Sequence, residues 1–177
     1  MPRRTREQGY GVILADPPWT FRNYSPKGED RNANQHYDVM TLGEIMTYRL
    51  PYMRRNCALF LWATDPLLPE ALQVMRAWGF TYSTVAFHWI KQTKSGEPFV
   101  GLGYWTRANP EICLFGTRGR PSRKSRTVRR ALFAPRRAHS QKPDEVYGAI
   151  EQLLDGPYIE LFARQRRSGW DASGDGL

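Results

Sequence analysis

An apolar run that ends abruptly at Asp16-Pro17-Pro18-Trp19 constrains the fold of this chain more than any other feature. The run, Gly11-Val12-Ile13-Leu14, is typical of a short strand buried on both faces. Two consecutive prolines end it, because each fixes its own φ and has no N–H to continue a sheet. Ligands of open α/β sheets bind at the carboxyl ends of strands, so we expect a ligand site at this turn.

The turn suits an aromatic amine that lies flat. We expect the carboxylate of Asp16 and the carbonyl oxygen of Pro17 to accept hydrogen bonds from an NH₂ group, with the proline carbonyls free of neighbouring donors. The exocyclic nitrogen of adenine or cytosine is a poor nucleophile, because its lone pair is delocalised into the ring. Two acceptors would free that lone pair, and a carboxylate would stabilise the positive charge that develops as a methyl group arrives. We therefore predict a catalytic site that needs no metal, with Trp19 as a flat apolar face, at Asp16, Pro17, Pro18 and Trp19.

The rest of the chain alternates predicted strands and helices. Thr41-Leu42-Gly43-Glu44 has capping-box spacing and predicts a helix that ends near Pro51. Asp65-Pro66 begins a second helix, and Pro143-Asp144-Glu145 a third. Strands are predicted over residues 10–15, 57–63, 82–90, 111–115 and 158–162, with a polar tail after residue 163. This order predicts one α/β domain, residues 1–177, around a mixed sheet.

Positive charge is concentrated in one segment. The net charge is +9, and nine Arg and Lys residues lie between Thr117 and Ala138 without any Asp or Glu. Such an excess indicates a polyanionic partner, usually nucleic acid, although a solvated disordered segment is the alternative. With candidates from the long loop at 20–40, the predicted nucleic-acid contacts are Arg22, Tyr24, Lys27, Arg118, Arg120, Arg123, Lys124, Arg126, Arg129 and Arg130.

Other site types find no support in the sequence. Cys57 and Cys113 lie in apolar runs and are expected to be core residues, and the three histidines are too scattered for a metal site. No run is long enough to span a membrane, and no signal peptide is visible at the start. We expect a cytoplasmic protein. The oligomeric state stays open, a homodimer included.

Several motifs, in this order, resemble one known family. They are Asp16-Pro17-Pro18-Trp19, Gly103-Tyr104-Trp105 followed by Glu111-Ile112-Cys113-Leu114-Phe115-Gly116, His139-Ser140-Gln141-Lys142-Pro143-Asp144-Glu145, and Glu160-Leu161-Phe162-Ala163-Arg164. The chain is similar, over nearly its whole length, to the adenine-N6 methyltransferases whose best known member modifies eukaryotic messenger RNA. That family also has many short bacterial and phage members.

The resemblance implies a Rossmann-like methyltransferase fold with a mostly parallel sheet and flanking helices. It also implies that the enzyme uses S-adenosylmethionine as its cofactor. The cofactor contacts that it implies are Asp16, Ser140, Lys142, Leu161, Phe162, Arg164 and Asp175. Three departures concern the cofactor. The chain begins too close to its first strand to include the acid–apolar pair that holds the cofactor adenine in longer members. Pro110 stands where those members have lysine, and Ala163 where glycine is usual.

The expected reaction is methyl transfer to the N6 amine of adenine in DNA, with the target base extruded from the duplex. Three alternatives remain at this point. The substrate can be RNA, the methylated base can be cytosine, or the chain can be an inactive nucleic-acid-binding partner subunit. The intact Asp16-Pro17-Pro18-Trp19 motif favours an enzyme, because the family's inactive members carry a degraded motif.

Overall fold

The computed structural model describes residues 9–20, 39–103, 105–137 and 141–174. Within these ranges the strands are β1 (Tyr10–Ala15), β2 (Met53–Ala63), β3 (Thr81–Gln92), β4 (Glu111–Arg118), β5 (Ala131–Pro135), β6 (Tyr158–Leu161) and β7 (Trp170–Ser173). The helices are α1 (Leu42–Met46), α2 (Leu68–Ala77) and α3 (Glu145–Leu153), and a 3₁₀ turn, η3 (Asp65–Leu67), precedes α2.

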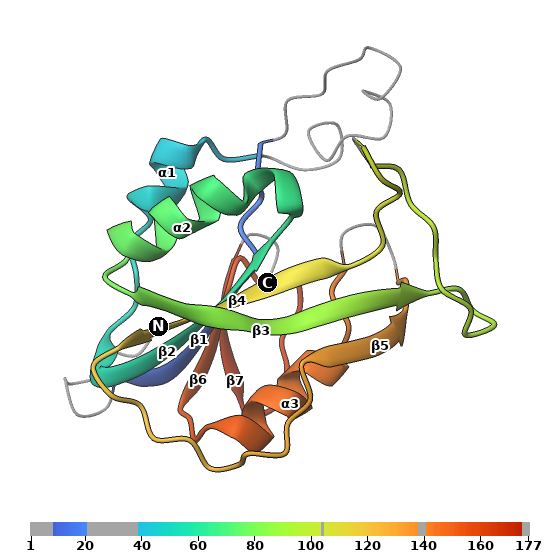
Figure 1. Cartoon of the computed structure of the whole chain (residues 1–177). Helices are drawn as coiled ribbons and strands as arrows, with labels where there is room; N and C mark the ends of the chain where they lie inside the picture. The colour runs from blue at the N-terminus through green and yellow to red at the C-terminus, as the bar shows by residue number, and fades with distance from the viewer. Residues whose placement is uncertain (1–8, 21–38, 104, 138–140, 175–177) are drawn as a thin grey trace.

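The strands form one sheet in the order β5-β3-β4-β2-β1-β6-β7. Strand β4 is antiparallel to both of its neighbours, and the other described pairings are parallel. Helices α1 and α2 cover one face of the sheet and α3 covers the other (Figure 1). The predicted α/β fold with a mostly parallel sheet and flanking helices is confirmed.

The strand directions create two chemically different edges. Every described strand except β4 ends at one edge, which we call the carboxyl edge, and β4 begins there. The opposite edge, where β1 and β2 begin and β4 ends, is the amino edge. Open α/β sheets bind ligands at the carboxyl ends of their strands, so the carboxyl edge is where a site is expected.

Two apolar cores explain why the β1 run contains no polar residue. Ile13 belongs to the core beneath α1 and α2, whereas Val12 and Leu14 belong to the core beneath α3. Because successive side chains of a strand point to opposite faces, a strand covered on both faces is apolar throughout. The two cysteines, Cys57 and Cys113, are buried as free thiols, as predicted.

The helix boundaries follow local signals. At α1 the Thr41 hydroxyl accepts from the Glu44 amide at 3.3 Å, and the Glu44 carboxylate accepts from the Thr41 amide at 2.7 Å. The predicted capping box is confirmed, but the helix ends at Met46 and does not reach Pro51. The second predicted helix begins with the turn η3 and ends before Gly79, whose φ of +80° suits a residue without a Cβ.

Two predictions about irregular segments were wrong. The basic segment 117–138 is not one loop, because its start belongs to β4 and it contains β5, which pairs with β3. The tail after residue 163 contains β7, which pairs with β6. Both strands are short and lie at the ends of the sheet, where tertiary contacts determine strand formation more than local pattern does. The Trp170 ring, for example, stacks on Tyr158 with 4.8 Å between centroids.

Truncation of a central core residue should test this packing. Leu59 lies in β2 and is fully buried beneath α1 and α2. We expect Leu59→Ala to lower the free energy of unfolding by about 3 kcal/mol, because it removes buried methyl groups and leaves a cavity. The matched control is Leu102→Ala at a side chain that is 64% exposed, where the loss should stay below about 0.5 kcal/mol. Chemical denaturation measures both, and equal losses would contradict the assigned core.

No helix among the described residues is long and apolar enough to cross a bilayer. Within the same ranges, His, Cys, Asp and Glu side chains form no group that could hold a metal ion.

Candidate active site

The carboxylate of Asp16 lies at the carboxyl edge, directly after β1. Its Oδ2 atom accepts a hydrogen bond from the Lys142 ammonium at 2.7 Å. Both side chains are largely buried, with 19% of Asp16 and 14% of Lys142 exposed. Lys142 belongs to the segment before α3, so the sheet brings together two residues that are 126 positions apart in the chain.

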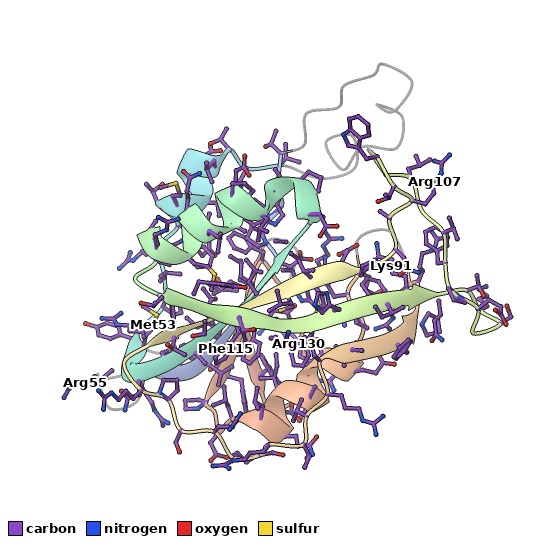
Figure 2. The ribbon with its side chains drawn as sticks, viewed as in Figure 1. Met53, Arg55, Lys91, Arg107, Phe115 and Arg130 are labelled. Carbon is purple, nitrogen blue, oxygen red and sulfur yellow. The ribbon has the colours of Figure 1, made fainter. Side chains whose placement is uncertain are left out.

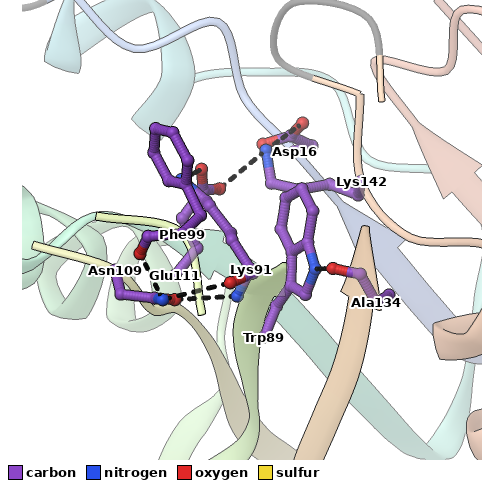
Figure 3. A network of polar contacts seen from close by, with 8 residues as sticks. All are labelled: Asp16, Trp89, Lys91, Phe99, Asn109, Glu111, Ala134 and Lys142. Carbon is purple, nitrogen blue, oxygen red and sulfur yellow. Dashed lines mark hydrogen bonds and ion pairs between the residues drawn. The ribbon is translucent and has the colours of Figure 1, made fainter. Parts of the chain in front are cut away.

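Two further charged residues extend this pair into a chain of four (Figure 3). The Lys142 ammonium lies 3.3 Å from Glu111 Oε2, and Lys91 Nζ lies 2.6 Å from Glu111 Oε1. Glu111 begins β4 and Lys91 is near the end of β3, so both lie at the carboxyl edge. Charges therefore alternate along Lys91, Glu111, Lys142 and Asp16, which we call the charge network.

The Asn109 side chain fixes the Lys91 end of the network. It accepts from the Lys91 amide at 2.8 Å and donates to the Lys91 carbonyl at 3.1 Å and to the Phe99 carbonyl. Beside it, the Trp89 indole N–H donates to the Ala134 carbonyl at 3.0 Å and joins β3 to β5. These bonds hold the strand ends in place and preorganise the network above them (Figure 3).

Burial and charge act in opposite directions on these groups. Burial raises the pKa of the Asp16 carboxyl, and the attraction of Lys142 only partly offsets it, so that this pKa stays above its usual value. Burial would also raise the pKa of Glu111, but Lys142 and Lys91 outweigh it and the pKa falls. For Lys142, burial would lower the pKa, but its two carboxylate partners raise it. Lys142 is therefore a permanent cation, and Asp16 is the carboxylate of the network that takes up a proton most readily.

Two expectations about the turn were wrong. The Pro17 carbonyl accepts from the Trp19 amide at 2.8 Å, and the Pro18 carbonyl accepts from the Met40 amide at 2.9 Å. Neither oxygen lacks a donor, because the Trp19 amide turns back to Pro17 and an isolated parallel β-bridge joins Trp19 to Met40. A carbonyl oxygen has a second lone pair, so Pro17 retains the capacity to accept from a ligand.

The Trp19 ring is not an exposed platform. Only 7% of Trp19 is exposed, and its indole N–H donates to the Trp62 carbonyl at 3.1 Å. The ring packs in the core beneath α1 and α2, where apolar burial and a satisfied N–H are both available. Trp19 thus anchors the turn that carries Asp16 and positions the carboxylate.

The predicted cofactor residues fall into three groups. Leu161 ends β6 beside Ala15, but its side chain is buried in the core, so its backbone is what borders the edge. Phe162 follows with a φ of 60°, a left-handed conformation that is uncommon for residues with a side chain, and its ring packs on Tyr48. Arg164 lies close enough to Asp16 to lower the pKa of that carboxyl. Ser140 and Asp175 lie outside the described residues.

The predicted nucleic-acid contacts are not gathered around Asp16. Arg22, Tyr24 and Lys27 lie outside the described residues. Arg118 ends β4 at the amino edge, opposite the charge network. Lys124 is engaged within the protein, since its ammonium lies 2.9 Å from Asp155 Oδ1. The remaining arginines of that set lie between β4 and β5 and are exposed; they are Arg120, Arg123, Arg126, Arg129 and Arg130.

Glu111 and Lys91 were not predicted as site residues. Glu111 was recognised only as part of a motif, because a sequence does not reveal that β4 runs antiparallel and so begins where its neighbours end. Lys91 is one of the 26 Lys and Arg residues of the chain, and only its pairing with Glu111 distinguishes it. The sequence signal was a carboxylate at the first position of an apolar strand, since such a residue lies at the carboxyl edge when the strand is antiparallel to its neighbours.

Glu111→Gln should change how the free energy of unfolding depends on pH. The folded pKa of Glu111 lies below its unfolded value, so ionised Glu111 stabilises the fold above pH 4.5. That contribution is lost as the pH falls through the folded pKa. We expect Glu111→Gln to lower the free energy of unfolding by about 2 kcal/mol at pH 7, because a buried ion pair is broken.

Urea denaturation between pH 3 and pH 7 measures the effect. The difference between Glu111→Gln and the unchanged protein should narrow below pH 4.5. A difference that is constant across this range would show that the ionised carboxylate does not stabilise the fold.

The charge network lies at the carboxyl ends of the strands, which is where open α/β sheets bind their ligands. Comparison with known families makes this specific, because residues 10–176 match the model of the MT-A70 family. The chain belongs to the MT-A70 family, so the resemblance to adenine-N6 methyltransferases is confirmed.

Individual relatives divide into two kinds. The type II methyltransferase M.MunI of Mycoplasma sp is 32% identical over 92% of this chain and 75% of its own length. The human N(6)-adenosine-methyltransferase catalytic subunit METTL3 is 29% identical over 88% of this chain, but over only 26% of its own length. The Arabidopsis thaliana N(6)-adenosine-methyltransferase MT-A70-like is 28% identical over 95% of this chain and 24% of its length. The chain thus spans about a quarter of these eukaryotic relatives.

Proposed function

We propose that this chain is an S-adenosylmethionine-dependent methyltransferase that modifies the N6 amine of adenine in DNA. The observation that supports the proposal is the position of Asp16, whose carboxylate lies at the carboxyl edge directly after β1 and 2.7 Å from the Lys142 ammonium. The bacterial relative, of which the chain covers three quarters, supports DNA as the substrate. A cytoplasmic location belongs to the same proposal, because bacterial and phage DNA is found there.

The residues present fit the cofactor. S-adenosylmethionine supplies an electrophilic methyl group and carries a carboxylate, an ammonium and a sulfonium. The carboxyl edge offers an anion for the positive groups in Asp16 and cations for the carboxylate in Lys142 and Arg164. The backbone of Leu161 and Phe162 would border the same ligand, as they follow the neighbouring strand.

Asp16 would act on the acceptor base. An ionised carboxylate accepts hydrogen bonds from the adenine amine, which localises the nitrogen lone pair, and it stabilises the positive charge that develops at that nitrogen. The Lys142 ammonium favours the ionised form of Asp16 and so opposes the effect of burial, which favours the protonated acid. Because the pair is largely buried, its field is weakly screened by solvent.

The extruded base would be the main structural cost of the reaction on duplex DNA. Unpairing and unstacking one adenine costs about a few kcal/mol, which contacts to the flanking phosphates can offset. Arginine side chains make such contacts without reading sequence. A single-stranded substrate avoids the cost of unpairing the adenine. The ratio of the single-strand rate to the duplex rate therefore reports how large that cost is.

The test is methyl transfer from tritiated S-adenosylmethionine to duplex DNA, single-stranded DNA and RNA of the same sequence. We expect labelled DNA, and hydrolysis should release N6-methyladenine. Transfer to RNA alone would contradict the proposed substrate, and N4-methylcytosine would contradict the proposed base. No transfer to any of the three would favour the inactive partner subunit.

A further inference from the structure

The exposed arginines between β4 and the segment after β5 follow a continuous path across the molecule. We define the basic track by these residues: Arg118, Arg120, Arg123, Arg126, Arg129, Arg130, Arg136 and Arg137. The segment from 118 to 137 contains no Asp or Glu. Repulsion among so many like charges is unfavourable in the free protein, so a polyanion that binds along them is favoured.

Hydrogen bonds to three elements show where the track runs. It starts at the amino edge, where the Arg120 amide donates to Asn56 Oδ1 at 2.9 Å. Midway, the Arg130 carbonyl accepts from the His88 amide at 2.9 Å, beside β3. At the carboxyl edge, the Arg136 amide donates to the Gln92 carbonyl at 3.0 Å. Figure 2 shows Arg55, which lies near the start, and Lys91, which lies near the end, on opposite sides of the molecule.

The end of the track lies close to the charge network. Arg137 forms an ion pair with Asp144, two positions after Lys142. The Arg136 guanidinium lies 3.8 Å from the centroid of the Phe99 ring, next to the segment that Asn109 holds. The end of the track therefore lies beside the two segments that carry Lys91 and Lys142 of the charge network.

The track is held in a fixed shape by residues other than its arginines. The Lys124 ammonium lies 2.9 Å from Asp155 Oδ1 and its amide donates to the Leu153 carbonyl at 2.9 Å. The Gln152 amide side chain donates to the Thr127 hydroxyl at 3.3 Å. Lys124 thus neutralises the nearest acid and ties the segment to the end of α3. Among the track arginines only Arg137 forms an ion pair with a described acid, so most of their charge is uncompensated, and the backbone that carries them needs little ordering for a ligand.

The distance from the start of the track to the charge network sets the length of nucleic acid that the track can contact. Strand β4 joins the two edges with its eight residues, so Arg118 and Glu111 lie about 23 Å apart at 3.3 Å per residue. In a duplex this distance corresponds to about seven base pairs at 3.4 Å each.

We infer that the basic track binds the phosphate backbone of nucleic acid on one side of the modified base, for about seven base pairs. This inference rests on the proposed function for the identity of the ligand. It predicts a footprint that is asymmetric about the target, because the track leads away from Asp16 in one direction.

The test is a double variant, Arg123→Gln with Arg126→Gln, which removes two track charges. Both side chains are exposed, and neither forms a hydrogen bond or ion pair with another described residue, so the fold should persist. The matched control is Arg49→Gln with Arg76→Gln, which removes two exposed arginines near α1 and α2, on the other face of the sheet.

Fluorescence anisotropy with labelled 24-base-pair DNA gives the affinity as a function of KCl concentration. We expect the track variant to bind about tenfold or more weakly at 0.1 M salt, with a salt slope smaller by about two, whereas the control changes less than twofold. Equal affinities and slopes in the two variants would overturn the inference, and so would the absence of binding by the unchanged protein.

A second measurement uses substrates on which methylation has been mapped. Shortening one flank of the target below about seven base pairs should raise the KM of the unchanged protein but not that of the track variant. Equal sensitivity of the two proteins to both flanks would overturn the inference. Normal track-dependent binding without any methyl transfer would refute the proposed function and leave the track standing.

Discussion

Asp16→Asn is expected to reduce methyl transfer about a thousandfold while leaving the fold intact. The substitution keeps the size of the side chain but removes the charge that would face the reacting amine, and loss of one such electrostatic group typically costs two to three orders of magnitude in rate. Asparagine also presents an NH₂ group, which repels another NH₂ group. Rates with tritiated S-adenosylmethionine on duplex DNA measure the effect.

The structure offers a matched control for this variant. Asp155 is exposed and lies beyond α3, where it pairs with Lys124. Asp155→Asn makes the same chemical change far from the charge network; it also releases Lys124 and can weaken DNA binding, but at saturating DNA it should alter the rate less than twofold. Both variants should stay folded at the assay temperature, although Asp16→Asn should unfold at a lower temperature because it breaks the buried pair with Lys142. A rate for Asp16→Asn close to that of Asp155→Asn would exclude Asp16 as the catalytic carboxylate.

Lys142→Met is expected to shift the pH dependence of the reaction. The ammonium of Lys142 opposes the effect of burial on the pKa of Asp16, and it also pairs with Glu111. Without that cation two carboxylates share a largely buried site, which favours protonation of one of them. We expect the pKa of the Asp16 carboxyl to rise further above its usual value, because the cation that opposes the effect of burial is gone.

The sign of the effect makes the experiment discriminating. Transfer requires ionised Asp16, so the rate rises with pH through the pKa of that carboxyl. In Lys142→Met this rise should occur at higher pH, so the loss of rate should be largest at acidic pH and should shrink as the pH increases. A pH–rate profile measures it.

Lys91→Met provides a graded comparison. Lys91 pairs with Glu111 at 2.6 Å but is not bonded to Asp16. Its removal should shift the profile in the same direction by a smaller amount. If Lys142→Met lowers the rate equally at every pH, then Lys142 acts by some means other than the ionisation of Asp16.

Local patterns were sufficient for the parts of the fold that are determined by neighbouring residues. The β1 strand, the capping box at Thr41 and Glu44, and the apolar run in β2 each follow from steric or hydrogen-bonding rules that act over a few positions. The same patterns located Asp16 at a strand end and identified the family. Short strands at the margins, β5 and β7, escaped detection because a neighbouring strand, and not their own sequence, stabilises them.

What the amino-acid sequence determined by itself was the set of candidate functional side chains: a carboxylate after a buried strand, a lysine before a helix, and an excess of arginine in one segment. Only the tertiary structure decided how they are combined. The fold brings Asp16, Lys91, Glu111 and Lys142 from four separate segments into one network. It also buries the Trp19 ring in the core and places most of the arginines away from the site. The physical reason is that strand order and direction depend on contacts between distant residues, which no local pattern encodes.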